Sequence, residues 1–182
     1  MNLFFRLLLV FFRARFAKQQ LGIFDEAVLK SRVLLTDQDM FAHMTNSRYF
    51  SFSDLAIINY IVRIGCWPIL RKKGWFPVVC GEDVILTRML RTPQKFEIRS
   101  RLAGWTEDYI CFHHRFVRDD KQTAEVHIVA RFASRKRDKV TIPDVVDAVG
   151  YDGESPQLSE HFLNMIRNID HSRETSRERS PV

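Results

Sequence analysis

The longest apolar pattern in the chain covers residues 50–70, where nonpolar side chains recur with helical spacing around most of the helix circumference. The polar edge is narrow and contains Asn59 and Arg63, four residues apart. A helix that is apolar on most sides is typical of a buried position. We therefore predict one long central helix over residues 50–70, which Gly65 and Pro68 bend or end.

After Pro77 the period of the pattern changes from that of a helix to that of a strand. Nonpolar and polar residues alternate through four segments, 78–90, 95–105, 109–117 and 123–135. Turn residues separate these segments, among them Arg91-Thr92-Pro93 and Asp119-Asp120-Lys121. A further strand is expected before the helix, at residues 28–35. Strands with one apolar face need a cover, so we predict an α+β fold in which an antiparallel sheet wraps around one long central helix.

The two ends of the chain differ from this central pattern. Residues 1–20 open with MNLFFRLLLVFFRARF, whose uninterrupted apolar run is shorter than the about 20 residues that span a bilayer. An interfacial helix with Arg6, Arg13 and Arg15 at lipid headgroups fits this segment. The alternative is a helix that packs on the domain or on a second copy of the chain. Short helices are expected at 140–149 and 158–169, and the polar segment 171–182 is expected to be disordered. We therefore divide the chain into an N-terminal helix (1–20), one domain (25–150) and a C-terminal helix with a polar tail (151–182).

Composition narrows the class of protein. The apolar fraction of 46% supports a packed core, and the net charge of +6 fits either anionic partners or a solvated basic surface. The basic residues are scattered and form no recognised nucleic-acid module, so no nucleic-acid partner is expected. Cys66, Cys80 and Cys111 have no paired spacing, which predicts reduced thiols. The expected location is cytoplasmic, with membrane association through residues 1–20 as an open alternative.

Chemically active side chains gather in the loop between the first strand and the central helix. Within a few residues this loop carries Asp37, Asp39, His43, Asn46 and Arg48. Polar groups in this place can use the free amide donors of a helix N-terminus, so the loop is the candidate site. Simpler roles are open for the same residues, since either Asp can cap a turn or helix and His43 can be a hydrogen-bonded packing residue.

The loop and the order of elements around it resemble a known family. Residues 37–49 read D-x-D-x-x-x-H-x-x-N-x-x-Y, and the similarity continues through Leu102-Ala103-Gly104-Trp105 and Arg115-Phe116-Val117. In these features the chain resembles hotdog-fold acyl-CoA thioesterases of the 4-hydroxybenzoyl-CoA thioesterase type. The resemblance implies a hotdog fold and hydrolysis of an acyl-CoA or acyl-carrier-protein thioester without a cofactor. It also implies homodimers joined edge to edge, sometimes paired into tetramers, with active sites at the dimer interface.

The resemblance also implies roles for particular residues. The catalytic carboxylate of the family matches Asp39, which would act as general base or nucleophile. The amide that polarises the thioester carbonyl matches the backbone N–H of Asn46, and His43 belongs to the same loop. Other hotdog thioesterases use an acidic residue on the central helix, and Asp54 is the second choice here. The alternative function is a non-catalytic, membrane-associated acyl-CoA-binding or scaffold protein of the same fold.

Two further groups of residues have side chains that can bind metals or phosphates. His113, His114 and His127 fall on predicted strands with a spacing that is not typical of zinc sites, so no metal is expected. Basic side chains on or near neighbouring strands could hold the phosphates of CoA or simply form a solvated face. These residues are Arg88, Arg91, Lys95, Arg99 and Arg101.

Overall fold

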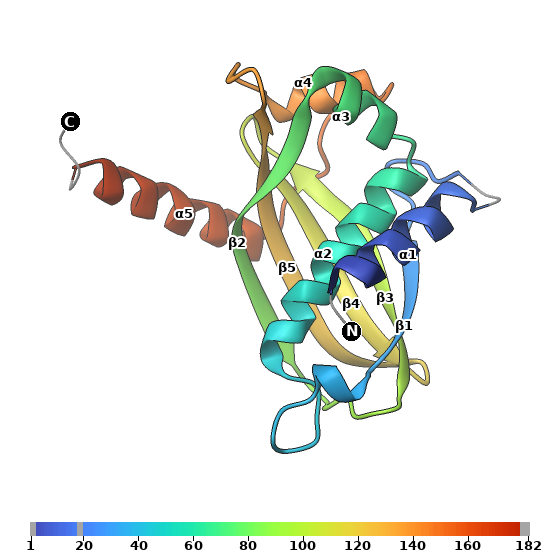
Figure 1. Cartoon of the computed structure of the whole chain (residues 1–182). Helices are drawn as coiled ribbons and strands as arrows, with labels where there is room; N and C mark the ends of the chain where they lie inside the picture. The colour runs from blue at the N-terminus through green and yellow to red at the C-terminus, as the bar shows by residue number, and fades with distance from the viewer. Residues whose placement is uncertain (1–2, 18–19, 179–182) are drawn as a thin grey trace.

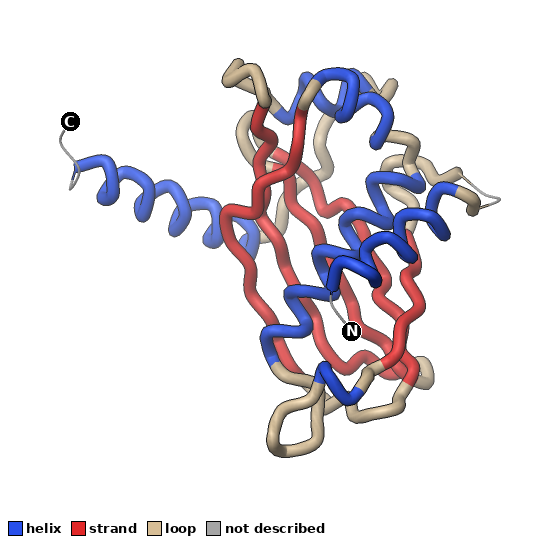
Figure 2. The backbone as a smooth tube through the Cα atoms, viewed as in Figure 1, coloured by secondary structure: helices blue, strands red, loops and turns tan. Residues whose placement is uncertain are grey.

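A computed structural model describes residues 3–17 and 20–178 of the chain. In chain order the elements are α1 (Leu3–Arg15), β1 (Ala27–Arg32), the short 3-10 helix η1 (Leu35–Asp37), α2 (Asn46–Arg63), α3 (Trp67–Lys73), β2 (Trp75–Leu86), β3 (Lys95–Trp105), β4 (Ile110–Arg118), β5 (Lys121–Ser134), α4 (Ile142–Ala148) and α5 (Glu160–Glu178). The five strands form one antiparallel sheet in the order β1-β3-β4-β5-β2. The sheet curves around α2, which confirms the predicted α+β architecture (Figures 1 and 2).

The concave face of the sheet and the apolar sides of α2 form the main core. Aromatic pairs connect the two layers, with ring centroids 5.1 Å apart for Tyr49 and Phe116 and 5.1 Å apart for Phe52 and Phe96. All four of these side chains are buried. The alternation seen in the sequence is therefore the alternation between this core and the outer, convex face of the sheet.

The central helical segment is divided in two. α2 begins at Asn46 and ends at Arg63, and the chain then turns at Gly65, whose φ of 75° lies in the left-handed region. α3 follows with Pro68 in its first turn, where the missing amide donor costs no helical hydrogen bond. The prediction of one helix over 50–70 is thus wrong at both ends, although the break occurs at the predicted glycine.

The strand predictions are accurate except near the edges of the sheet. β3 has the predicted bounds, and β4 and β5 differ from theirs by one or two residues. The predicted turn between them is present, with φ of 50° at Asp119 and 56° at Asp120, as a tight hairpin with a right-handed twist requires. β2 is shifted toward the N-terminus of its predicted span and carries a bulge between Val79 and Gly81.

The N-terminal helix α1 packs along α2 with one face and exposes the other (Figure 1). Its inner face buries Arg6, Val10 and Ala14. The packed alternative is therefore confirmed for this face. The prediction that Arg6 lies at lipid headgroups is wrong, because Arg6 forms a buried ion pair with Asp37. The outer face carries the exposed apolar side chains Phe4, Phe5, Leu8, Leu9 and Phe12, and exposed Phe16 directly follows the helix.

Within residues 3–17 and 20–178, no single helix is both long enough and apolar enough to cross a membrane. α2 and α3 together satisfy those two criteria, but only as a pair that bends by 93°.

The C-terminal segment is more ordered than its composition suggests. α4 begins with Pro143 in its first turn, as predicted, and α5 continues to Glu178. Disorder from residue 171 was therefore a wrong prediction as far as 178, and residues 179–182 lie outside the described part of the chain. The hydroxyl of Tyr109 explains much of this order, because it donates to Asp170 Oδ1 at 2.5 Å and accepts from Arg173 at 2.8 Å.

Candidate active site

Asp37 is the buried anchor of the candidate loop. Its side chain is 1% exposed, and its Oδ2 atom lies 2.6 Å from the Arg6 guanidinium and accepts the Leu34 N–H at 2.9 Å. The Arg48 guanidinium lies 3.4 Å from the other carboxylate oxygen. The capping role that was open for Asp37 is therefore confirmed, and this residue holds the loop in place between α1, η1 and α2.

Asp39 and His43 form a pair within the same loop. Asp39 Oδ1 accepts the Phe41 N–H at 2.8 Å, and Asp39 Oδ2 lies 3.2 Å from His43 Nδ1. The backbone also joins the two residues, because the Asp39 N–H donates to the His43 carbonyl at 3.0 Å. The Asp39 side chain remains 29% exposed. The carboxylate is thus fixed by a local turn and still reachable from solvent.

Asn46 is the first residue of α2. Its amide has no acceptor within the helix and lies at the positive end of the helix dipole. His43 and Asn46 both line a cavity of about 180 Å³, together with Tyr49 and residues 86–89 at the end of β2. The structure therefore brings His43 and Asn46 to one cavity. Asp39 does not line this cavity but contacts His43, which does.

Asp54 lines a second and more apolar cavity. It lies eight residues along α2 from Asn46, or about 12 Å at the rise of a helix. The cavity measures about 220 Å³ and lies between α2, the concave face of the sheet and α4. Its walls are mostly aliphatic and aromatic, and include Ile57, Ile61, Leu102, Phe112, Ala130, Phe132 and Val145. The structure thus separates Asp54 from the loop residues and places it beside a space suited to an apolar chain.

Glu82 is a further residue of this region, outside the site residues predicted from the sequence. Burial raises its pKa to about 7, and the negative charge of Asp54 contributes to the increase. Burial also raises the pKa of Asp54. The signal was available in the strand pattern, because Glu82 shares the concave face of β2 with Val84. Two neighbouring carboxylates whose pKa values are both raised by burial are typical of functional sites.

The basic residues proposed for phosphate binding do not form one surface. Arg99 contacts Glu97 and Asp120, and Arg101 lies 3.0 Å from Glu26. Arg88 lines the cavity that contains His43 and Asn46. Of the five candidates, Arg88 is therefore the one that the structure places beside the loop.

The predicted strand histidines lie on both faces of the sheet. His114 is fully buried in the core, where its Nδ1 is 2.7 Å from the Ser100 hydroxyl and burial lowers its pKa to about 3. His113 and His127 lie on the convex face, on the far side of the sheet from α2. None of the three takes part in the cavities described above.

Comparisons with known proteins agree with this architecture. Residues 33–150 match the family described as the Thioesterase-like superfamily. Protein THEM6 of Xenopus laevis is 30% identical over 181 residues, which cover 98% of this chain and 86% of that protein. Protein THEM6 of Danio rerio is 33% identical over 114 residues, which cover 63% of this chain and 56% of that protein.

Solved structures show the same fold at low identity. The probable thioesterase YbaW of Escherichia coli has a TM-score of 0.62 at 12% identity, covering 68% of this chain and 96% of that chain. The gentisyl-coenzyme A thioesterase BH1999 has a TM-score of 0.60 at 19% identity, covering 66% of this chain and 98% of that chain. These likenesses establish a hotdog-type fold for the central part of the chain.

Proposed function

The chain belongs to the Thioesterase-like superfamily, and from this membership we propose that it hydrolyses an acyl-CoA or acyl-carrier-protein thioester. The observation that carries the proposal is the apolar cavity of about 220 Å³ under α2, because an acyl chain needs a dry, elongated space. Nonpolar side chains from α2, the sheet and α4 supply that space. Asp54 on its wall gives the cavity a polar boundary at which a thioester could stop.

Asp39 is the first candidate for the catalytic carboxylate. It would activate a water molecule or attack the thioester carbonyl directly, and its contact with His43 at 3.2 Å keeps it oriented. The Asn46 amide, free at the start of α2, would donate to the oxyanion that develops on the carbonyl oxygen. One such donor typically lowers the barrier by about 3 kcal/mol.

Asp54 is the alternative carboxylate. It lines the proposed acyl cavity directly, and burial raises its pKa, which makes it a stronger base. Glu82 beside it could hold the proton that Asp54 accepts, since the pKa of Glu82 is about 7. Asp39 lies in the loop before α2 and Asp54 lies within α2, so single substitutions separate the two assignments.

A homodimer would bring a second chain to the site. β2 is an edge strand that pairs with β5 on one side, and its exposed apolar residues include Phe76, Val79 and Ile85. A long apolar edge favours pairing with another strand. The cavity that contains His43 and Asn46 also reaches the end of β2, so edge-to-edge association would place a second copy next to the loop.

The outer face of α1 fits a membrane surface. Phe5, Phe12 and Phe16 are exposed there, and Arg13 and Arg15 lie on the same helix where they can meet acidic headgroups. Because Arg6 and Val10 hold the opposite face on α2, the helix would lie flat on a membrane without leaving the domain. This surface supports peripheral association with a bilayer.

A second function is supported by one observation. Both Asp39 carboxylate oxygens already have contacts within the loop, to the Phe41 N–H and to His43. If these contacts persist when acyl-CoA binds, the protein binds the acyl group without cleaving it and acts as an acyl-CoA-binding or scaffold protein.

The deciding experiment measures hydrolysis of a panel of acyl-CoAs by the full chain and by Asp39→Asn and Asp54→Asn. We expect Asp39→Asn to lower kcat by about 100-fold or more. Asp25→Asn is the matched control, because Asp25 also accepts a backbone amide in a local turn, from Gly22 at 2.8 Å, but lies outside both cavities.

Each other outcome has a definite meaning. Normal activity in Asp39→Asn with loss in Asp54→Asn transfers the catalytic role to Asp54. No turnover by the unaltered chain, with acyl-CoA binding still detected by calorimetry, replaces the enzyme proposal by the binding function.

A further inference from the structure

A row of ionisable side chains crosses the convex face of the sheet, on the side opposite α2. Asp83 of β2 pairs in register with His127 of β5, and His127 pairs with His113 of β4. Register partners point to the same side of a sheet, so the three side chains lie next to one another. The row is separated from both cavities of the candidate active site by the thickness of the sheet.

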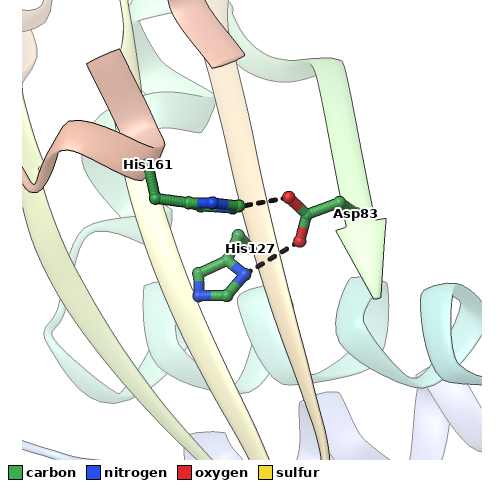
Figure 3. A group of neighbouring side chains, drawn as sticks. All are labelled: Asp83, His127 and His161. Carbon is green, nitrogen blue, oxygen red and sulfur yellow. Dashed lines mark hydrogen bonds and ion pairs between the residues drawn. The ribbon is translucent and has the colours of Figure 1, made fainter. Parts of the chain in front are cut away.

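α5 adds a third histidine to this row. His161 comes from the first turn of α5, and its Nε2 lies 2.6 Å from Asp83 Oδ2. His127 Nδ1 lies 2.8 Å from Asp83 Oδ1, and the two imidazole rings are 4.4 Å apart between centroids. Figure 3 shows the two rings on the same side of the Asp83 carboxylate, each directed toward one of its oxygens.

The far side of His127 also has a carboxylate partner. Its Nε2 lies 3.7 Å from Glu125 Oε2, and the same oxygen lies 3.1 Å from His113 Nε2. A histidine that binds a metal through one nitrogen commonly directs the other toward a carboxylate, which fixes the ring and increases its basicity. His127 has this arrangement, with Nδ1 toward Asp83 and His161 and Nε2 toward Glu125.

We propose that Asp83, His127 and His161 bind a divalent transition-metal ion, for which Zn²⁺ is the best match. Their ligand atoms lie within 4.8 Å of one another and come from three different elements. Two imidazoles and one carboxylate form a ligand set that zinc accepts, with water in the fourth position. Glu125 and His113 form the outer layer of the site.

The spacing shows what binding would change. Ligands of a tetrahedral zinc ion at about 2.0–2.1 Å from the metal lie roughly 3.3 Å from each other. The two His–Asp contacts, 2.6 and 2.8 Å, are shorter than this, so each must open by less than 1 Å. A small rotation of the His161 side chain, which is 45% exposed, can supply that movement.

The proposed ion would fasten α5 to the sheet. At present this end of α5 is held by a small apolar cluster around Phe162, Tyr109, Cys111 and Val129. A metal shared by β2, β5 and α5 would add a link at the start of the helix. Binding should therefore slow the local opening of α5 without reaching the acyl cavity on the other face.

The test is titration of the chelator-treated full chain with Zn²⁺ by calorimetry, followed by hydrogen exchange of the backbone amides. We expect about one ion per chain and slower exchange in residues 160–173 when zinc is present. His161→Asn should weaken zinc binding by about 100-fold or more, and Glu125→Gln by about tenfold. His171→Asn is the matched control, because His171 lies on the same helix outside the cluster and should bind zinc normally.

Other results would overturn the proposal. Absence of zinc binding at micromolar concentrations would leave Asp83 as a hydrogen-bonding partner of two histidines and nothing more. Loss of binding in His113→Asn with normal binding in His161→Asn would place the ion on the neighbouring group of His113, Glu125 and His127 instead. Circular dichroism of each variant separates loss of binding from loss of fold.

Discussion

The Arg6 guanidinium and the Asp37 carboxylate lie 2.6 Å apart in the interior, with side-chain exposures of 9% and 1%. This ion pair connects the first helix of the chain to the loop of the candidate site. Arg6 also lies over the ring of Phe52 at 4.9 Å from its centroid, so the pair is enclosed on the α2 side as well. α1 is therefore a structural part of the domain and anchors the loop through Asp37.

Removing one member of this pair should be costly. Arg6→Met leaves the buried Asp37 carboxylate with the Leu34 N–H and with a single, more distant cation, the Arg48 guanidinium at 3.4 Å. We expect a loss of about 3 kcal/mol in the free energy of unfolding, measured by urea denaturation. Arg13→Met changes an exposed arginine of the same helix and should alter stability by less than about 0.5 kcal/mol. Equal effects of the two substitutions would show that the buried pair does not stabilise the fold.

Glu82 should make stability depend on pH in the neutral range. Its folded-state pKa of about 7 lies above the ordinary value of 4.5, so the native state holds the proton more tightly than the unfolded chain. The free energy of unfolding should therefore fall as pH rises from 4.5 through 7. Glu82→Gln should remove this fall and raise stability at pH 8 by about 1 kcal/mol, a figure reduced for the half-buried position. Glu154→Gln, at an exposed position, is the control, and an unchanged pH profile in Glu82→Gln would refute the prediction.

His114 should have the opposite dependence at acidic pH. Burial lowers its pKa from 6.5 to about 3. Between these two pH values the imidazole is therefore protonated in the unfolded chain and neutral in the native core. Stability should decrease as pH falls from 6.5 toward 3, by about 1.4 kcal/mol for each pH unit from this one group. Thermal unfolding of His114→Gln across this range should show a shallower decrease than the unaltered chain. His171→Gln, on an exposed surface, should keep the original slope.

The volume of the apolar cavity should limit the acyl chain. Ala130 is buried and lines the cavity from β5, so Ala130→Leu places additional carbon atoms in the space. We expect hydrolysis of long-chain acyl-CoA to fall by about tenfold or more relative to a short-chain substrate, measured as kcat/KM. A uniform loss for all chain lengths would indicate a damaged fold, and no change would place the acyl group elsewhere.

The exposed face of α1 should bind lipid. A variant with Phe5→Ser, Phe12→Ser and Phe16→Ser keeps the buried face and the Arg6–Asp37 pair intact. We expect it to sediment much less with vesicles that contain anionic lipid. Phe76→Ser, which removes an exposed aromatic ring from β2, should sediment normally. Equal sedimentation of the triple variant and the unaltered chain would exclude α1 as the lipid contact.

Much of the fold is predictable because alternation and helical spacing are local properties. Both face assignments in β3, β4 and β5 follow from the sequence, as does the hairpin at Asp119 and Asp120. The burial of Arg6 is not predictable in this way, because it depends on Asp37, a partner 31 positions away. The order of α5 beyond His171 has the same origin, since Tyr109 holds Asp170 and Arg173 across more than 60 positions.

The part of the candidate site that the sequence predicts is one contiguous motif, and residues that join it from other elements are not predictable in the same way. Asp39, His43 and Asn46 are close in sequence and remain close in space. Glu82 and Asp54 meet only when β2 folds against α2, and His161 reaches His127 only when α5 returns to the sheet. The sequence spacing of the strand histidines contains no information about His161, because that residue comes from a distant helix.

The break after α2 places the turn that follows this helix in the wall of the apolar cavity. Ile64 and Cys66 at this turn line the cavity together with Val145, Val146 and Val149 of the α4 region, and Ile64 lies ten residues beyond Asp54. Ten helical residues correspond to about 15 Å. An acyl group that enters beside Asp54 would therefore have about 15 Å of space along α2 before it meets Ile64 and Cys66.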